Sequence, residues 1–287
     1  MSGPGKTFLL GVGCMKGGTS WLHDYLAASP QCEPGFRKEY HVFDGLDLPA
    51  EAWMRRRVLA RARKAADAVE EGRPADATAL QQASFYADPE LYFDYFAALA
   101  HRDERTRLVA DITPAYAHLS VERLSGIRAS FEQRGLRTVA VFLMRDPVDR
   151  IWSQVRMNQG RRPEDFPGTP ADWVAELYAQ PGYEARTRYD RTLDALEQAF
   201  APEQIFYAFY ERLFDPDVLA ALCAVLGIDY REPDLDRRVN ESPVSEPLPD
   251  ELVRTVARHY RPVYDAVARR FDVGALHELW PSSRFLD

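Results

Sequence analysis

A glycine-containing loop near the start of the chain carries a lysine and two hydroxyl side chains. It reads Gly13-Cys14-Met15-Lys16-Gly17-Gly18-Thr19-Ser20 and separates an apolar run from an amphipathic segment. Glycines let backbone N–H groups approach an anion, and a helix that begins here adds partial positive charge. The loop therefore predicts a phosphate site with Lys16 as its full charge. A plain glycine turn with a Thr or Ser N-cap and a solvated lysine is an equal alternative.

The order of residues in this loop differs from that of an ATP-binding P-loop. In a P-loop the lysine follows the last glycine and directly precedes the Ser/Thr that binds magnesium. Here Lys16 precedes Gly17 and Gly18, so no hydroxyl group stands beside the lysine to hold magnesium. The chain also has no dense cluster of His, Cys and Asp at metal-ligand spacing, and we expect no metal.

A second pair of candidate phosphate ligands follows the most apolar strand candidate. Arg145 stands where that strand ends, and ligands of open parallel sheets collect at the carboxyl ends of strands. Ser153 comes eight residues later, about two helical turns, so both side chains could converge on one phosphate. Taken alone, this segment favours a simpler alternative, in which Arg145 or Arg150 pairs with the aspartates one and four residues after Arg145.

Strands must position both sites, and the apolar runs predict where these strands lie. Strand patterns cover residues 7–13, 108–110, 138–144 and 205–209. Helical periodicity covers residues 19–28, 51–71, 89–100, the stretch through Val155, 171–179, 184–200, 216–226 and about 250–271. The alternation predicts an α/β fold: one P-loop-like domain over residues 1–287 with a central, mostly parallel sheet flanked by helices.

Two segments of this pattern suggest covers over a site. The helix at 51–71 is a candidate flap, although a surface helix with a solvated basic face is the favoured interpretation. Residues 158–170 are rich in Gly and Pro, which predicts a loop that is a candidate lid.

Composition narrows the class of protein. The 287 residues carry a formal net charge of −8, which argues against a general nucleic-acid partner. Three scattered cysteines, Cys14, Cys32 and Cys223, fit a reducing compartment. No stretch approaches 18 apolar residues, and the first apolar run is too short for a signal sequence. We therefore expect a cytoplasmic protein without a transmembrane segment.

Together these segments resemble the sulfotransferase family that uses 3′-phosphoadenosine 5′-phosphosulfate (PAPS). Residues 16–21 look like its 5′-phosphosulfate loop, and residues 145–153 look like its 3′-phosphate motif. Lys38-Glu39-Tyr40-His41-Val42-Phe43 resembles the Lys-Glu-x-His-x-Phe stretch of the branch that includes carbohydrate and many bacterial sulfotransferases, rather than the phenol branch. Residues 209–213 and 238–240 resemble a later strand end and a basic C-terminal cofactor loop. The matches run in the expected order from residue 8 to about 240.

The resemblance implies a donor site whose members are assigned by matched position. They are Lys16 at the bridging oxygen and 5′-phosphate, Gly17, Gly18, Thr19 and Ser20 in the cradle, Trp21 and Tyr210 near the adenine, and Arg145, Ser153 and Arg238 at the 3′-phosphate.

The resemblance also implies a catalytic base in the Lys-Glu-x-His stretch. Glu39 is the favoured base and His41 is the competing assignment. Residues 111–116 resemble a family segment in which a lysine is common, but Ile112 stands at that position. Lys38 is a candidate substitute for the missing lysine.

The implied reaction moves a sulfuryl group from PAPS to a hydroxyl or amine by in-line displacement, leaving adenosine 3′,5′-bisphosphate. A small molecule, lipid or sugar would be the acceptor, with the segments near 44–105 and 156–188 over its site. Two alternatives stay open: a nucleotide-binding scaffold without activity, and an atypical ATP-using P-loop kinase. The position of Lys16 argues against the kinase, and Glu39 argues against the scaffold. The sequence indicates no oligomeric state.

Overall fold

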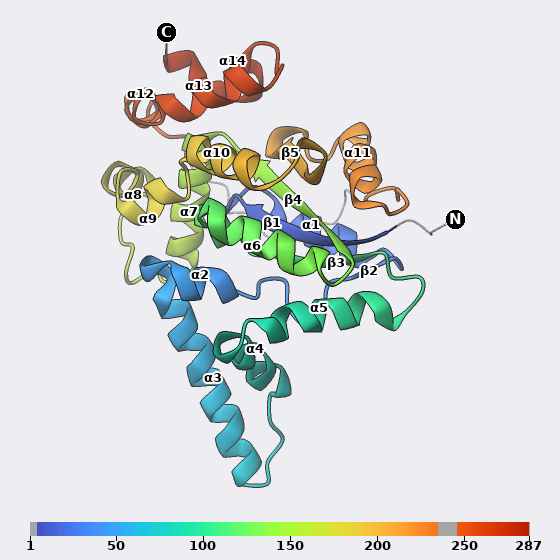
Figure 1. Cartoon of the computed structure of the whole chain (residues 1–287). Coiled ribbons are helices and arrows are strands. Elements are labelled where there is room, and N and C mark those ends of the chain that lie inside the picture. Colours follow the sequence, from blue (N-terminus) through green and yellow to red (C-terminus); the bar gives the residue numbers. More distant parts are fainter. Residues whose placement is uncertain (1–4, 235–245, 287) are drawn as a thin grey trace.

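A five-stranded parallel sheet forms the centre of the molecule (Figure 1). The structure is a computed structural model and describes residues 5–234 and 246–286. The strands run in the order β2-β3-β1-β4-β5. Their bounds are Lys6–Gly13 (β1), Cys32–Glu33 (β2), Leu108–Ile112 (β3), Leu136–Met144 (β4) and Ile205–Phe209 (β5). The predicted α/β class with a mostly parallel sheet is confirmed.

Alternate residues of the central strands enter two hydrophobic clusters, one on each face of the sheet. On β1, Phe8 and Leu10 belong to one cluster and Leu9 belongs to the other. On β4, Phe142 and Leu143 divide in the same way. Because successive side chains of a strand point to opposite faces, a central strand covered on both sides is apolar throughout. This explains why β1 and β4 give the clearest strand signals in the sequence.

Helices cover both faces of the sheet. The larger cluster receives side chains from α5 (Glu90–Arg102), α6 (Val121–Glu132), α7 (Pro147–Arg161), α10 (Tyr189–Ala199), α12 (Asp250–His259) and α13 (Arg261–Arg270). The smaller cluster receives side chains from α1 (Thr19–Ala27) and α11 (Pro216–Leu226). The carboxyl ends of the strands meet the starts of helices and turns at one edge of the sheet, which is where ligands of such sheets bind.

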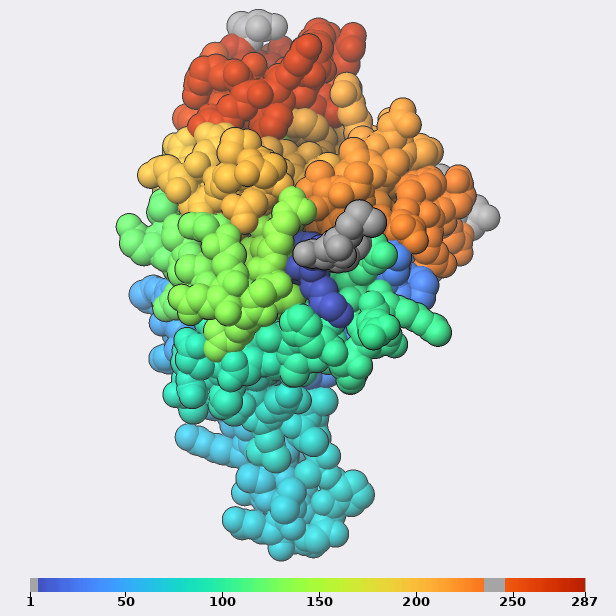
Figure 2. Space-filling model, turned by 45° about the vertical axis from the view of Figure 1, so that its right-hand side comes forward, coloured from blue at the N-terminus to red at the C-terminus, as the bar shows by residue number. Residues whose placement is uncertain are grey.

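A helical hairpin projects from the body of the molecule (Figures 1 and 2). It consists of α3 (Ala52–Glu70) and α4 (Ala77–Ala87), and it follows the short helix α2 (Val42–Asp47). Several small residues of α3 are buried, whereas Arg56 and Arg63 are exposed. The predicted helix at 51–71 is confirmed, as is its solvated basic face.

Three predictions of local structure were wrong. The loop expected from residue 158 begins only after Arg161, because one interior glycine, Gly160, costs a helix little and the first proline is Pro163. The helix expected at 184–200 is divided into α9 (Pro181–Ala185) and α10. The helix expected at 250–271 is two helices, α12 and α13, and Pro262 near the start of α13 cannot donate to a preceding turn.

The remaining helices are short. They are α8 (Pro170–Leu177) and α14 (Leu276–Leu279), together with 3-10 turns at Pro49–Glu51, Pro114–His118, Pro202–Gln204, Tyr210–Arg212 and Pro281–Phe285. Among the described residues, no helix has the length and apolar character needed to span a membrane.

Candidate active site

The loop around Lys16 lies at the carboxyl ends of the two central strands. The backbone N–H of Cys14 donates to the carbonyl of Leu143 at the end of β4, over 2.6 Å. Gly18 is the N-cap of α1, with φ of 89°, and no side chain caps this helix. The alternative with a Thr or Ser N-cap was therefore wrong, and the first turn of α1 keeps amide donors without a side-chain acceptor.

Two glycines of this loop lie in places that a side chain would fill. A Cβ on Gly17 would come 2.7 Å from the sulfur of Cys14, and a Cβ on Gly18 would come 2.6 Å from Leu213. Gly18 also has a left-handed backbone conformation that favours glycine. Close packing thus accounts for both glycines and keeps the backbone open toward a ligand.

Several positive charges surround Lys16. Partial burial lowers the pKa of Lys16 to about 8, and the nearby cations Arg145, Arg161, Arg156 and Lys38 act in the same direction. Like charges that crowd together raise the free energy of each charged form. A bound polyanion would relieve this repulsion, so the electrostatics of the loop suit a ligand with several negative charges.

Arg145 joins the loop to the 3-10 turn that follows β5. Its Nη1 donates to the carbonyl of Lys16 over 3.1 Å, and its guanidinium lies 4.4 Å from the ring centroid of Tyr210. The Nε of Arg145 is buried and has no hydrogen-bond partner in the part of the chain that the structure describes. Ser153 is buried in the second turn of α7. The structure thus brings Lys16, Arg145 and Tyr210 together.

The ion pairs that favoured a simpler interpretation of this segment are not formed among the described residues. Instead, the carboxylate of Asp146 accepts from the backbone N–H of Val148 and from both the N–H and the hydroxyl of Ser282. Arg145 is thereby left to face the loop. Arg238 lies outside the described residues.

Aromatic rings line the other side of the loop. Trp21 stacks on Tyr25 with 5.4 Å between centroids and meets Phe214 edge-on at 4.9 Å. Phe214 also contacts Tyr210 at 5.9 Å and is 36% exposed. Trp21 itself is almost fully buried, so it serves the core as well as this aromatic surface. Rings of this kind offer flat apolar contact to a purine.

Lys38 links the phosphate loop to the candidate base. Its Nζ lies 3.3 Å from the hydroxyl of Thr19 and 2.6 Å from Oε1 of Glu39. The backbone carbonyl of Lys38 accepts from the N–H of Ile112 at the end of β3, which fixes the segment beside the sheet. Glu39 therefore lies next to the loop that carries Lys16, although the two are far apart in sequence.

Glu39 is also the first member of a chain of three side chains. Its Oε2 lies 3.1 Å from Nε2 of His41, and Nδ1 of His41 lies 2.6 Å from Oδ2 of Asp44. Asp44 is fully buried in α2. Sequence reasoning missed Asp44, because its contact with His41 depends on the left-handed backbone of His41 (φ 55°) just before α2, which the sequence does not indicate.

These contacts set the charge states of the pair. Burial favours neutral forms, but the hydrogen bonds from His41 and the charge of Lys38 lower the pKa of Glu39 to about 2. Burial likewise opposes charge on His41, yet its bonds to Asp44 and Glu39 raise its pKa to about 10. At neutral pH, Glu39 is therefore an ionised carboxylate and His41 a charged imidazolium that cannot accept a proton.

Ile112 cannot take the place of the lysine common in the resembling family. Its side chain is buried, and a Cβ on Gly11 would lie within 2.8 Å of it. Ile112 thus belongs to the core between β1 and β3. Among the described residues, the ammonium that contacts the candidate base is that of Lys38.

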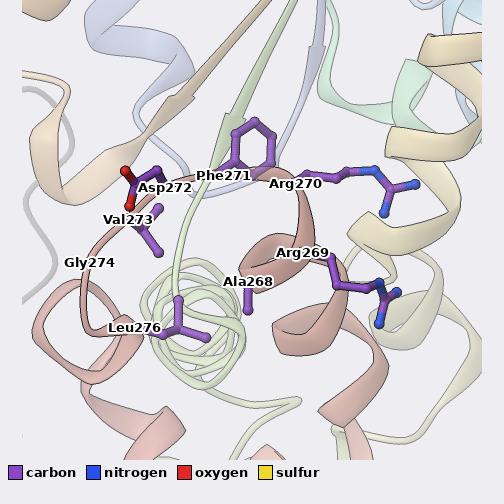
Figure 3. Close-up of a pocket in the computed structure, with 8 residues that line it drawn as sticks. All are labelled: Ala268, Arg269, Arg270, Phe271, Asp272, Val273, Gly274 and Leu276. Atoms are coloured by element: carbon purple, nitrogen blue, oxygen red, sulfur yellow. The ribbon is translucent and has the colours of Figure 1, made fainter.

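Two hollows on the surface lie apart from these residues. The first, of about 350 Å³, is formed by the turn between α13 and α14 (Figure 3). Figure 3 shows Arg269 and Arg270 pointing away from it, and Arg270 is paired with Asp194 and Glu197. The second, of about 200 Å³, lies between the start of α7 and residues 281–285. Neither is lined by a predicted site residue, and the described residues contain no group of three or more His, Cys, Asp or Glu side chains arranged so that they could hold a metal ion.

The parallel sheet, the uncapped helix behind a glycine loop and the surrounding cations define an α/β class suited to a phosphorylated ligand. Comparison with known proteins then identifies the family. The chain belongs to the sulfotransferase family, whose model matches residues 9–232. The resemblance found in the sequence is confirmed.

A solved structure agrees with the fold. A sulfotransferase from Alicyclobacillus acidocaldarius is 18% identical, with a TM-score of 0.58, and the similarity covers 94% of this chain and 96% of that chain. The sulfotransferase domain of the Synechococcus PCC 7002 olefin synthase is also 18% identical, with a TM-score of 0.49 and coverage of 93% and 95%. No curated protein matches the sequence.

Proposed function

We propose that this protein transfers a sulfuryl group from PAPS to a hydroxyl or amine of a small-molecule, lipid or sugar acceptor, with Glu39 as the base. One observation carries the proposal: Lys38 contacts both Thr19 of the anion loop and Glu39. A loop suited to a phosphorylated donor and an ionised carboxylate therefore share one ammonium group.

The chemistry of the donor set supports PAPS. Two phosphates and a sulfuryl group carry about four negative charges, and several cations gather around Lys16. Arg145 offers a buried Nε without a partner, and Ser153 lies two turns along the helix that follows it. Tyr210, Trp21 and the exposed Phe214 offer rings near the same cations.

Bound at this loop, PAPS would supply an activated sulfuryl group with a phosphate leaving group. As the acceptor oxygen or nitrogen forms its bond to sulfur, Glu39 takes the acceptor proton, and the bond from sulfur to the 5′-phosphate oxygen breaks. Lys16 and the amides at the start of α1 stabilise the charge that grows on that oxygen.

Lys38 offers a way for a carboxylate with a low pKa to act as a base. In the free protein, the charged His41 and the ammonium of Lys38 hold Glu39 ionised but weakly basic. When a donor anion draws Lys38 toward Thr19, the carboxylate loses part of that stabilisation and becomes a better base. In this role Lys38 replaces the lysine expected at Ile112.

Calorimetric titration tests the donor assignment first. We expect adenosine 3′,5′-bisphosphate to bind tightly and ATP weakly, and we expect Arg145→Ala to lose at least tenfold in bisphosphate affinity. An equivalent change at an exposed paired arginine, Arg254→Ala, should leave the affinity unchanged. Preference for ATP with magnesium would favour the kinase, and bisphosphate binding without transfer to any acceptor would favour the scaffold.

A further inference from the structure

Near the phosphate loop lies a fully buried arginine for which the described residues supply no charge partner. Arg150 in α7 is 0% exposed, and its Nη1 donates to Oε1 of Gln154 over 2.8 Å. Its Nε and Nη2 are buried with no hydrogen-bond partner. Among residues 5–234 and 246–286, no carboxylate forms an ion pair with it. A buried guanidinium keeps its proton at neutral pH, so an unpaired charge and two unpaired donors remain in the core.

The surroundings of Arg150 are aromatic rather than acidic. Its guanidinium lies 6.0 Å from the ring centroid of Tyr183, whose hydroxyl accepts from the amide of Asn158. Tyr189, which acts on the charge of Arg150, is itself buried with its hydroxyl 3.3 Å from the sulfur of Cys14. These groups are neutral phenols and a thiol, so they do not balance the positive charge of Arg150.

Two further basic side chains complete the cluster. His118, at the end of the 3-10 turn Pro114–His118, has a buried Nε2 without a partner. Arg186 follows α9 and pairs with the buried carboxylate of Glu51, which also accepts from Nε1 of Trp53. Burial lowers the pKa of His118 to about 4, and the charges of Arg186 and Arg150 contribute, so this imidazole is neutral at pH 7.

In this cluster the positive charges outnumber the negative charges by one. Of the side chains of this cluster, Arg150 and Arg186 are cations and Glu51 is the anion, and the carboxylate of Glu51 is already shared between Arg186 and Trp53. The nearby carboxylates of Glu184 and Glu211 contact Arg188 and Trp280 instead of Arg150. One positive charge is left, together with N–H donors on Arg150 and an imidazole nitrogen on His118. We infer that the protein binds a small monovalent anion of the chloride type between Arg150 and His118.

The size and charge of the ligand follow from the same observations. Water would satisfy the free N–H groups but would leave the guanidinium charge unbalanced. A carboxylate on a large acceptor would need a path to a side chain that is 0% exposed. A halide carries one negative charge and accepts hydrogen bonds from any direction, so it suits converging N–H groups. This site is separate from the donor site and does not depend on the proposed function.

Thermal unfolding of the full chain measures the binding. We expect the Tm to rise with the logarithm of chloride concentration when chloride replaces gluconate at constant ionic strength, because an anion bound to the folded state stabilises it. Arg150→Met should abolish the rise. Arg254→Gln, which changes an exposed arginine, and Arg145→Gln, which changes the donor site, should both retain it. A flat Tm for the wild type, or loss of the response in Arg145→Gln, would overturn the inference.

A second measurement covers the case in which Arg150→Met fails to fold. Crystals of the wild-type protein soaked in bromide should give an anomalous peak beside Nη2 of Arg150 and Nε2 of His118. His118→Phe should lower the height of that peak by at least half. Bromide peaks confined to the loop around Lys16, or to the surface, would contradict the proposed site.

Discussion

Glu39 shows how neighbours determine the chemistry of one carboxylate. Lys38 and His41 lie at its two oxygens, so the group stays ionised far below neutral pH. His41 has both ring nitrogens engaged by carboxylates, and its raised pKa leaves it protonated at neutral pH. These charge states support the proposal of Glu39 rather than His41 as the base, and we propose that His41 and Asp44 orient it.

The first prediction concerns Glu39 itself. Glu39→Gln keeps the size of the side chain but cannot take a proton, so we expect turnover to fall at least 1000-fold while bisphosphate affinity changes less than threefold. Glu164→Gln, at an exposed carboxylate, serves as the matched control. Initial rates with PAPS and calorimetry give the two readouts. Normal turnover of the Glu39→Gln variant would remove this residue from the mechanism.

A second prediction concerns the charge on Lys16. The donor product needs the ammonium form, and the pKa of Lys16 is lowered to about 8 in the free protein. Affinity for adenosine 3′,5′-bisphosphate should therefore fall as pH rises from 7 through 8 to 9, by up to tenfold per unit. Both phosphates of this ligand are monoesters with a second pKa near 6, so they are mostly dianionic above pH 7 and add little slope there.

Calorimetry between pH 7 and 9 measures this dependence, with Lys16→Ala as the control. The variant should bind more weakly and should show no slope across the same range. A wild-type affinity that is constant up to pH 9 would mean that Lys16 does not contact the anion.

At the scale of elements, the central strands could be predicted because they are buried on both faces. Among the helices that the sequence did not reveal, α2 and α14 are short, and α4 and α6 have weaker apolar patterns. In α6, Ser120 caps the helix and Leu124, Ile127 and Phe131 are buried, which is a helical period that sequence reasoning overlooked. The two-residue strand β2 is held by pairing with β3 rather than by any pattern of its own.

The candidate site, too, could be predicted only in part. The loop residues and Arg145 were predicted because their types and spacing indicate anion binding. Asp44 and the bridge from Lys38 to Thr19 depend on how α2 and the phosphate loop meet, which no local pattern specifies. The alternative ion pair between Arg145 and Asp146 is not formed among the described residues. Ser282, which lies more than a hundred residues away in sequence, donates hydrogen bonds to Asp146 instead.

A third prediction tests the packing of the loop. Gly18→Ala forces a left-handed backbone and a contact of 2.6 Å with Leu213. We expect a loss of about 1–3 kcal/mol in the free energy of unfolding and at least a tenfold loss in bisphosphate affinity. Gly126→Ala, in the middle of α6 with open space around it, should instead stabilise the protein by about 0.5–1 kcal/mol.

Urea unfolding and calorimetry on these two variants give both quantities. A Gly18→Ala protein that binds the bisphosphate normally would show that the loop tolerates a side chain and that its glycine is not required by the ligand.

At the scale of the whole molecule, the C-terminal helices are part of the same hydrophobic cluster as the sheet. Val263 and Trp280 pack in the cluster that contains Phe8 and Phe142. Polar contacts also connect the C-terminal segment to the rest of the molecule, because Ser282 donates to Asp146 and Nε1 of Trp280 donates to Glu211. These contacts support the proposal that residues 1–287 form a single domain.

A fourth prediction follows from Asp146, whose burial raises its pKa to about 6. A carboxyl that ionises less readily in the folded state makes folding less favourable as pH rises from about 4 to about 6. The wild type should lose up to about 3 kcal/mol relative to Asp146→Asn across this interval. Asp146→Asn is expected to be less stable overall, so the slope with pH is the readout.

Chemical denaturation at several pH values between 4 and 7 measures that slope. Parallel curves for the two proteins would show that Asp146 is ionised in the folded state throughout, held so by the hydrogen bonds from Ser282 and Val148.

The hydrogen bonds between Ser282 and Asp146 also bear on how much of the chain is needed. The family match ends at residue 232, fifty residues before the serine that holds the carboxylate next to Arg145. A chain cut at the end of the recognisable region would remove the donors of Ser282 and Tyr264 from the carboxylate of Asp146 and leave it the N–H of Val148, directly beside the arginine proposed to bind PAPS. The similarity to relatives ends before the C-terminal segment. A chain shortened to the similar region would therefore lose the hydrogen bonds that hold Asp146 in position next to Arg145.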